Sequence, residues 1–192
     1  ALDINAFISS ATKNDGYYIA RYEASYGEDG KPNSKISIGE PAILETTPKT
    51  EGMLWNWVTQ EQASKASQNM YNSTSFTSDL INSYAWDTAI VFIQTFSDKK
   101  DYSMQEGKSL NSILSNTGTN NDVQLNINDM AGGVRELTTE HCFYMNDGVP
   151  RSNTVRGGSY YYDDRYVSSR YGWQSGKGND GLGFRTILYM SF

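Results

Sequence analysis

The fold of this chain is decided by residues 156–192, RGGSYYYDDRYVSSRYGWQSGKGNDGLGFRTILYMSF. Thr154 and Val155, just before this stretch, and residues 186–190 inside it are rich in β-branched and aromatic side chains, a composition that predicts strands. Glycine pairs beside both strands indicate places where one backbone passes close to another. The two ends are therefore expected to belong to the framework of the fold.

Between these ends, residues 160–180 have a different composition. Tyr, Ser, Asp, Arg, Asn and Gly dominate, and Val167 is the only aliphatic residue. Tyr and Trp supply wide amphipathic contact area at low entropic cost, Ser and Asn supply adaptable hydrogen bonds, and Arg adds planar charged donors. Two interpretations stay open: a polar loop whose tyrosines pack on the core, or a ligand-contacting surface held between two strands.

Length and charge exclude several classes of protein. The chain has 192 residues, which favours one domain over residues 1–192 that buries roughly 70% of its unfolded surface. A net charge of −6 argues against a nucleic-acid or anionic-membrane binder. Residues 156–185 carry five basic and three acidic side chains, a local charge of +2 that leaves −8 elsewhere, so a polar ligand suits this segment better than a polyanion.

Cysteine content and hydropathy add further limits. Cys142 is the only cysteine, which excludes an intramolecular disulfide and a zinc site built on several thiolates. No apolar run is long enough to span a bilayer. Ala1 begins without a basic, apolar signal segment, so we expect an excised domain or a processed terminus.

Three helices are expected from their caps and apolar spacing. Asp3 can cap a short helix that reaches about residue 14. Thr59 and Gln62 have capping-box spacing, which predicts a helix over residues 60–71. Asn82 or Ser83 can cap a third helix, in which Trp86, Ala89, Ile90, Ile93 and Phe96 form an apolar stripe that we assign to the core.

Strands and loops are less sharply defined. Residues 16–24 alternate loosely and predict a strand, and residues 36–44, which carry Pro41, predict an edge strand. Residues 97–128 are polar and predict a long surface excursion. Its expected anchors are Ile113 with Leu114, and residues 123–125.

Six motifs in a fixed order carry a family resemblance. They are GYYIARYEA at 16–24, the predicted helix at 83–96, DMAGGVRELT at 129–138, VRGGSY at 155–160, SR at 169–170 and GFR at 183–185. The chain thereby resembles the formylglycine-generating-enzyme, or sulfatase-modifying-factor, family, a variant of the C-type lectin fold. The resemblance implies an α+β domain in which two helices pack on a small, twisted, mostly antiparallel sheet with long loops.

The catalytic chemistry of that family is not expected here. The resemblance implies that an oxidase carries two copper-binding cysteines shortly after the RGGSY motif, and Tyr162 and Val167 stand at those positions. Cu(I) needs thiolate or thioether ligands, which neither residue supplies. A branch resembling sulfoxide synthases needs several histidines for iron, whereas His141 is the only one. His141 and Cys142 are neighbours on a predicted strand, so they point to opposite faces and are interpreted as structural.

The resemblance also implies a calcium site in the DMAGGVRELT motif. The matching positions are Asp129, Gly132, Val134 and Glu136, which offer hard oxygen donors. Two departures weaken the match, because Gly133 replaces an Asn and the neighbouring Arg135 replaces a Trp and can pair with Glu136. Calcium and a metal-free tight turn therefore stay open as alternatives, and no other cofactor is required.

A further resemblance suggests the function. Sequences with this ending include the variable proteins of diversity-generating retroelements, found on phage tail tips and bacterial surfaces. It implies a non-catalytic domain, C-terminal in a longer protein, that binds a cell-surface protein or glycan receptor, with homo-oligomers among the expected assemblies. The residues expected to contact ligand are Tyr160, Tyr161, Tyr162, Asp164, Arg165, Tyr166, Ser168, Tyr171, Trp173 and Asn179. The alternatives are a divergent family enzyme that uses Asp163, Asp164 and Arg165, and a structural capping domain.

Overall fold

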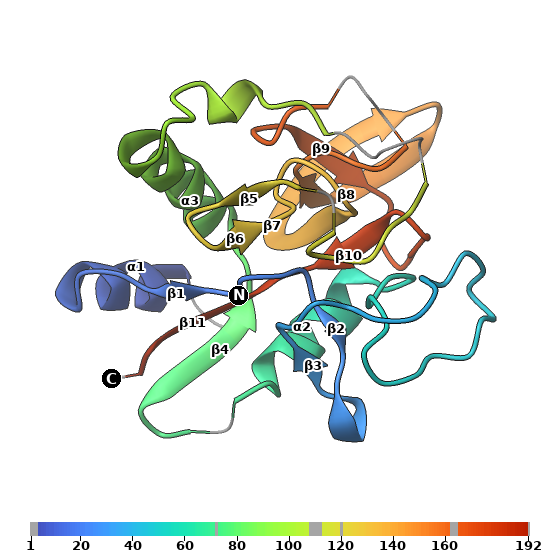
Figure 1. Cartoon of the computed structure of the whole chain (residues 1–192), viewed down its shortest axis with the longest axis horizontal. Helices are drawn as coiled ribbons and strands as arrows, with labels where there is room; N and C mark the ends of the chain where they lie inside the picture. The colour runs from blue at the N-terminus through green and yellow to red at the C-terminus, as the bar shows by residue number, and fades with distance from the viewer. Residues whose placement is uncertain (1–3, 72, 108–112, 120, 162–164, 192) are drawn as a thin grey trace.

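The structure is a computed structural model that describes residues 4–71, 73–107, 113–119, 121–161 and 165–191. Its secondary structure is of the α+β class, as the sequence predicts (Figure 1). The helices are α1 (Ile4–Lys13), α2 (Gln60–Gln68) and α3 (Ser83–Phe96), with short 3₁₀ turns at Glu28–Gly30 and Tyr102–Met104. In the described residues no helix is both long and apolar enough to cross a membrane.

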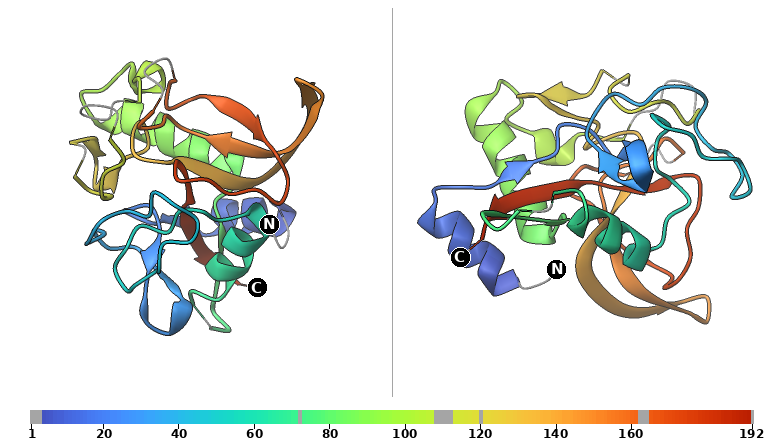
Figure 2. Two further views of the ribbon diagram at one scale, coloured as in Figure 1. Left: turned by 90° about the vertical axis from the view of Figure 1, so that its right-hand side faces the viewer. Right: turned by 90° about the horizontal axis from the view of Figure 1, so that it is seen from below.

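Two sheets carry most of the strand structure. One joins β1 (Tyr18–Ile19), β11 (Thr186–Met190) and β4 (Phe76–Leu80), and the other has the order β10 (Leu182–Phe184), β7 (Arg135–Asn146), β8 (Val149–Arg156) and β9 (Arg170–Trp173). Every pairing in them is antiparallel except β10 with β7, so the predicted mostly antiparallel character is confirmed. Two small ribbons complete the strands, β2 (Ser25–Tyr26) with β3 (Pro32–Asn33) and β5 (Val123–Gln124) with β6 (Ile127–Asn128). Figure 2 shows the β7–β8 hairpin extending away from the rest of the domain.

The helices begin where the local sequence predicts. The Thr59 side chain accepts from the Gln62 amide and the Gln62 side chain accepts from the Thr59 amide, which completes a capping box for α2. The Asn82 side chain caps α3 by accepting from the Ala85 amide at 2.9 Å. Both caps satisfy amides that have no partner inside the helix, which is why these boundaries are encoded locally.

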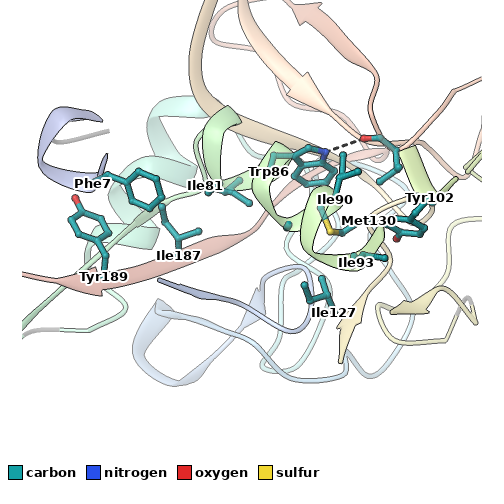
Figure 3. Packing of buried hydrophobic residues seen from close by; sticks show 14 residues of the cluster. Phe7, Ile81, Trp86, Ile90, Ile93, Tyr102, Ile127, Met130, Ile187 and Tyr189 are labelled. Atoms are coloured by element: carbon teal, nitrogen blue, oxygen red, sulfur yellow. Dashed lines mark hydrogen bonds between the residues drawn. The ribbon is translucent and has the colours of Figure 1, made fainter. Parts of the chain in front are cut away.

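The largest apolar cluster packs on α3. Figure 3 shows Trp86, Ile90 and Ile93 of this helix beside Met130 and Tyr102, and all five side chains are buried. The predicted stripe of α3 is thus core, except that its last member, Phe96, is exposed.

The two faces of the four-stranded sheet meet different partners. Leu137, Val155 and Tyr171 are paired across β7, β8 and β9 and lie on the face that packs against a second apolar cluster. Arg156 and Arg170 are paired across β8 and β9, and both reach Asp87 on α3. One face of β9 therefore carries Tyr171 and Trp173, and the other turns Arg170 toward α3.

Three expectations from the sequence need correction. Residues 36–44 form no strand: the carbonyl of Ala42 instead accepts from the Asn56 side chain at 2.8 Å and the Trp57 indole at 2.9 Å. The strand expected over residues 16–24 is limited to β1. In the excursion over residues 97–128, Leu114 is buried as expected, but Ile113, Val123 and Leu125 are exposed.

Close backbone approach explains one of the glycine pairs. A Cβ on Gly158 would lie 1.8 Å from the carbonyl oxygen of Ala131 and 2.5 Å from the Cα of Gly107. No side chain fits there, so the RGGSY motif is held against the DMAGG turn by backbone contact. The prediction of close approach is confirmed at this position.

Candidate functional site

Arg185, which directly follows β10, is the centre of a buried charged cluster. Its Nε and Nη2 donate to the Glu136 carboxylate at 2.7 to 3.1 Å. Its Nη1 donates to the carbonyls of Ala20 and Arg21, and Nη2 also donates to that of Asn128. The sequence suggested an ion pair between Arg135 and Glu136, but the partner of Glu136 is Arg185. The Arg135 guanidinium instead lies 4.9 Å from the centre of the Trp173 ring.

Two further carboxylates complete this cluster. Glu23 accepts the Val134 amide at 2.9 Å through Oε1, and Asp129 accepts the Thr117 hydroxyl at 3.1 Å and the Gly118 amide through Oδ2. Within the described part of the chain, the other oxygen of each carboxylate is buried and has no hydrogen-bond partner. Burial raises the pKa of Glu23 well above its usual value, and the charges of Asp129 and Glu136 raise it further.

The backbone of the DMAGG turn is shaped around Glu23. Gly133 has φ +70°, and a Cβ there would lie 2.5 Å from Glu23 Oε1. Asp129 itself has φ 62°, in the left-handed region. The Asn that the family resemblance implies at position 133 could not be accommodated without moving Glu23.

The donor set predicted for calcium fits such an ion only in part. Asp129 keeps one carboxylate oxygen without a hydrogen-bond partner, but both oxygens of Glu136 accept from the Arg185 guanidinium. Gly132 and Val134 lie buried in the turn between them. Across the described residues, no group of three or more His, Cys, Asp and Glu side chains is arranged to hold a metal ion. Calcium binding at these four positions stays a prediction.

The tyrosines after the RGGSY motif divide into buried and exposed side chains. Tyr160 is only 9% exposed, and its hydroxyl donates to Asp180 Oδ2 at 2.6 Å. Burial, followed by the hydrogen bond to Asp180, raises the pKa of Tyr160 above its usual value. In contrast, Tyr161 is 64% exposed and Tyr166 is 41% exposed. Tyr160 thus supports the segment, while Tyr161 and Tyr166 face solvent.

Arginines accompany the aromatic side chains farther along the segment. The Arg165 guanidinium lies 4.2 Å from the ring centre of Tyr171 and donates to its hydroxyl. The Trp173 ring has Arg135 at 4.9 Å and Arg151 at 5.9 Å, and its indole donates to the Lys177 carbonyl at 2.8 Å. Cation–π contacts of this kind hold aromatic rings in place at a partly exposed surface. The contribution of Arg135 and Arg151 could not be predicted from the sequence, because these residues lie on β7 and β8, outside the segment that carries Trp173.

The remaining predicted contact residues have mixed surroundings. Ser168 is exposed, and its carbonyl accepts from Arg156 at 3.3 Å. Asn179 is half-buried and its carbonyl accepts the Trp57 amide at 3.0 Å. Tyr162 and Asp164 lie outside the described residues, as does Asp163. We call Tyr161, Arg165, Tyr166, Tyr171 and Trp173 the aromatic surface.

Val167, Cys142 and His141 are the described residues that the sequence analysis weighed for redox or nucleophilic chemistry. Val167 is fully buried, and its carbonyl accepts the Trp86 indole at 2.9 Å. Cys142 lies on β7 with its thiol 3.4 Å from the Asn153 carbonyl, and the His141 ring lies 3.3 Å from the Ser152 carbonyl. Val167 is therefore a core residue, and Cys142 belongs to the β7–β8 hairpin.

These features define an α+β domain of the lectin-like class in which glycine contacts hold an RGGSY-type motif against the DMAGG turn and a buried arginine pairs with Glu136. The family described as "Sulfatase-modifying factor enzyme 1-like domain" matches residues 22–190, and the chain belongs to this family. A solved structure titled "Crystal Structure of CarF" is similar with a TM-score of 0.57 and 14% identity, over 91% of this chain and 87% of that one. That likeness supports the fold. No curated protein sequence matches the chain.

Proposed function

We propose that this domain is a non-catalytic ligand-binding module that presents its aromatic surface to a cell-surface protein or glycan receptor. The observation that carries the proposal is the contrast around the RGGSY motif. Val167, at a position where the resemblance implies a copper-binding cysteine, is part of the core, whereas Tyr161 and Tyr166 are exposed. A buried valine offers no ligand to copper, and exposed tyrosines are frequent contact residues in binding surfaces.

The charges around this surface support a binding role. Arg165 lies over Tyr171, and Arg135 and Arg151 lie over Trp173, so the aromatic rings are presented together with guanidinium donors. Tyr, Trp and Arg are the residue types that contribute most binding energy at protein interfaces. The framework beneath them is rigid, because Tyr160 and Val167 are fixed by hydrogen bonds to Asp180 and Trp86.

Binding to arrayed cell-surface proteins and glycans tests this proposal. We expect the wild-type domain to retain a receptor, and the double variant Tyr161→Ala/Tyr166→Ala to lose at least tenfold in affinity with an unchanged melting temperature. Tyr71→Ala is the matched control, since Tyr71 is 51% exposed in the loop before β4. Equal loss in the control, or no loss in the double variant, contradicts the proposal. Stoichiometric copper or iron together with turnover would favour the enzyme alternative.

We also propose that the gene belongs to a diversity-generating retroelement. Tyr, Asn, Asp and Ser are frequent products of adenine-directed rewriting, and they are abundant in residues 160–180. Sequencing the flanking DNA for a near-identical template repeat and a reverse transcriptase tests this point. Their absence would overturn diversification and leave the binding proposal standing.

A further inference from the structure

A polar cleft with two lobes lies around β7, with one lobe on the side of the four-stranded sheet that faces α3 and the other on the side that faces α2. The first lobe is a cavity of about 620 Å³ between the start of α3, α1 and β7. The second is a cavity of about 610 Å³ between α2, β7, β8 and the turn after β9. Thr139 and His141 of β7 line both cavities, so the lobes adjoin along this strand. Each lobe has the size of a small-molecule site.

A β-bulge in β7 lies where the two lobes adjoin. Leu137 pairs with Val155 and His141 with Asn153, so four steps along β7 match two along β8. Such a bulge redirects side chains and is common beside binding sites. The Thr139 amide donates to the Ile81 carbonyl at 3.0 Å, so the bulge is tied to the segment between β4 and α3.

The first lobe is built around a chain of ion pairs. Arg170 contacts Asp87 and Glu140 at 3.3 Å each, Arg156 contacts the other oxygen of Asp87, and Ser83 donates to Glu140. Asp87 and Arg170 have half-exposed side chains, so their polar atoms remain accessible to a ligand. Arg170 and the buried Arg156 behind it balance the two carboxylates, so this chain of ion pairs carries no net charge.

Tyr84 adds an aromatic platform to the same lobe. Its side chain is 63% exposed at the start of α3 and lines the cavity. An exposed ring beside accessible carboxylate and guanidinium groups can pack on an apolar patch of a ligand while those groups bind its hydroxyls.

The second lobe is also polar and electrically balanced. Its charged residues, Glu61 and Lys65, pair with each other at 2.6 Å. Most of its other lining is hydroxyl and amide, including Gln60, Ser64, Gln68, Ser152, Asn153 and Ser175. The Gln60 side chain donates to the Thr138 and Glu140 carbonyls, which fixes the start of α2 against β7 and gives the lobe a preformed shape.

We propose that this cleft binds a neutral oligosaccharide, with one part of the chain in each lobe. The balanced charges disfavour a polyanion or a basic peptide, either of which needs an excess of the opposite sign. Hydroxyl, amide and paired carboxylate groups match the donors and acceptors of sugar hydroxyls. The lobes adjoin at Thr139 and His141, so one extended ligand that passes over this part of β7 can occupy both. Tyr171 and Trp173 lie on the face of β9 opposite Arg170, so the first lobe is separate from the aromatic surface, whereas Asn153 of the second lobe is paired with Trp173.

Calorimetric titration of the whole domain with neutral gluco-, manno- and N-acetylglucosamine oligosaccharides of one to six units tests the proposal. We expect at least one series to bind, with affinity rising at least tenfold between the monosaccharide and the longer members. Sialylated and sulfated versions should bind more weakly. Absence of binding in all three series, tighter binding of the charged versions, or capture of an extended peptide in place of sugar overturns the proposal.

Variants in each lobe locate the binding site. Tyr84→Ala should weaken the longer sugar at least tenfold, and Ser64→Phe, which fills the second lobe, should remove the length dependence. Tyr71→Ala and Ser9→Phe are matched controls, because Tyr71 and Ser9 are exposed away from the cleft. Melting temperatures establish that all four variants fold. If Tyr161→Ala/Tyr166→Ala abolishes sugar binding and the cleft variants do not, the sugar occupies the aromatic surface and the cleft proposal is wrong.

Discussion

The buried charged cluster and the aromatic surface use the same residue types for opposite purposes. In the cluster, Arg185 is fully buried and each of its terminal nitrogens donates to a carboxylate or a carbonyl. On the aromatic surface, Arg165 lies over the partly exposed Tyr171, where solvent still reaches the pair. The comparison teaches that burial decides whether an arginine of this chain maintains the fold or is available to a ligand.

Removing the buried arginine should have the largest effect. Arg185→Met leaves Glu136 without its partner beside Glu23 and Asp129, and we expect a loss of about 3–5 kcal/mol in the free energy of unfolding, measured in urea. Arg170→Met, at a half-exposed ion pair, should cost less than about 1 kcal/mol. Similar losses for both variants would show that burial does not decide how much an arginine of this chain contributes to stability.

Gly158→Ala should rank second. The added Cβ would overlap the Ala131 carbonyl at 1.8 Å, so the RGGSY motif must move away from the DMAGG turn, at a cost of about 1–3 kcal/mol. Thermal unfolding measures this loss. Gly148→Ala is the comparison, because Gly148 has φ +74° with open space around it, so only backbone strain of about 1 kcal/mol is expected. A smaller loss for Gly158→Ala than for Gly148→Ala would argue against a rigid contact.

The third effect concerns pH. The pKa of Glu23 is raised in the folded state from a usual value of 4.5, because burial disfavours its charge. At pH values between 4.5 and the raised pKa of the folded state, folded Glu23 binds a proton that unfolded Glu23 has lost. The stability that this group contributes therefore falls as pH rises above 4.5.

Glu23→Gln removes that pH dependence and keeps an oxygen that can accept the Val134 amide. We expect the variant to be more stable than wild type near pH 7, and the difference to shrink toward pH 4.5. Urea unfolding at several pH values measures both quantities. Parallel pH profiles for the two proteins would show that Glu23 does not titrate in this way.

The smallest effect on stability should come from the aromatic surface. Tyr161→Ala/Tyr166→Ala removes two exposed rings, and we expect a change of less than about 0.5 kcal/mol in the free energy of unfolding. The same variant is expected to lose receptor binding. A large loss of stability would place these rings in the framework and would contradict their assignment to a binding surface.

The sequence predicted elements whose signals are local. The Thr59 capping box, the Asn82 cap and the apolar stripe from Trp86 to Ile93 each depend on residues within one or two helical turns, and the structure confirms them. The prediction of a strand over residues 36–44 was wrong. This segment was expected to form an edge strand, but Ile36 and Ile38 are exposed and none of residues 36–44 is in a strand.

Family motifs extended the prediction beyond local signals but did not assign individual side chains. The order of the motifs led to the α+β class and to the family that the comparison with known proteins shows. The DMAGGVRELT motif suggested calcium ligands, and the resemblance to variable proteins grouped Tyr160 with Tyr161 as ligand contacts. Only the tertiary structure shows that Tyr160 is buried and donates to Asp180 whereas Tyr161 faces solvent. Adjacent residues in an irregular segment can point in any direction, so the sequence does not distinguish them.

Composition alone determined that this chain is a single-cysteine, acidic protein with an aliphatic-poor segment between two strand-forming ends. Helix caps and glycine pairs were likewise readable, because each depends on neighbouring residues or on the absence of a side chain. Tertiary structure decided that Arg185 pairs with Glu136, that Val167 lies in the core, and that a polar cleft forms beside β7. These outcomes join residues far apart in the sequence, and the burial that gives each charge its role exists only once the chain has folded.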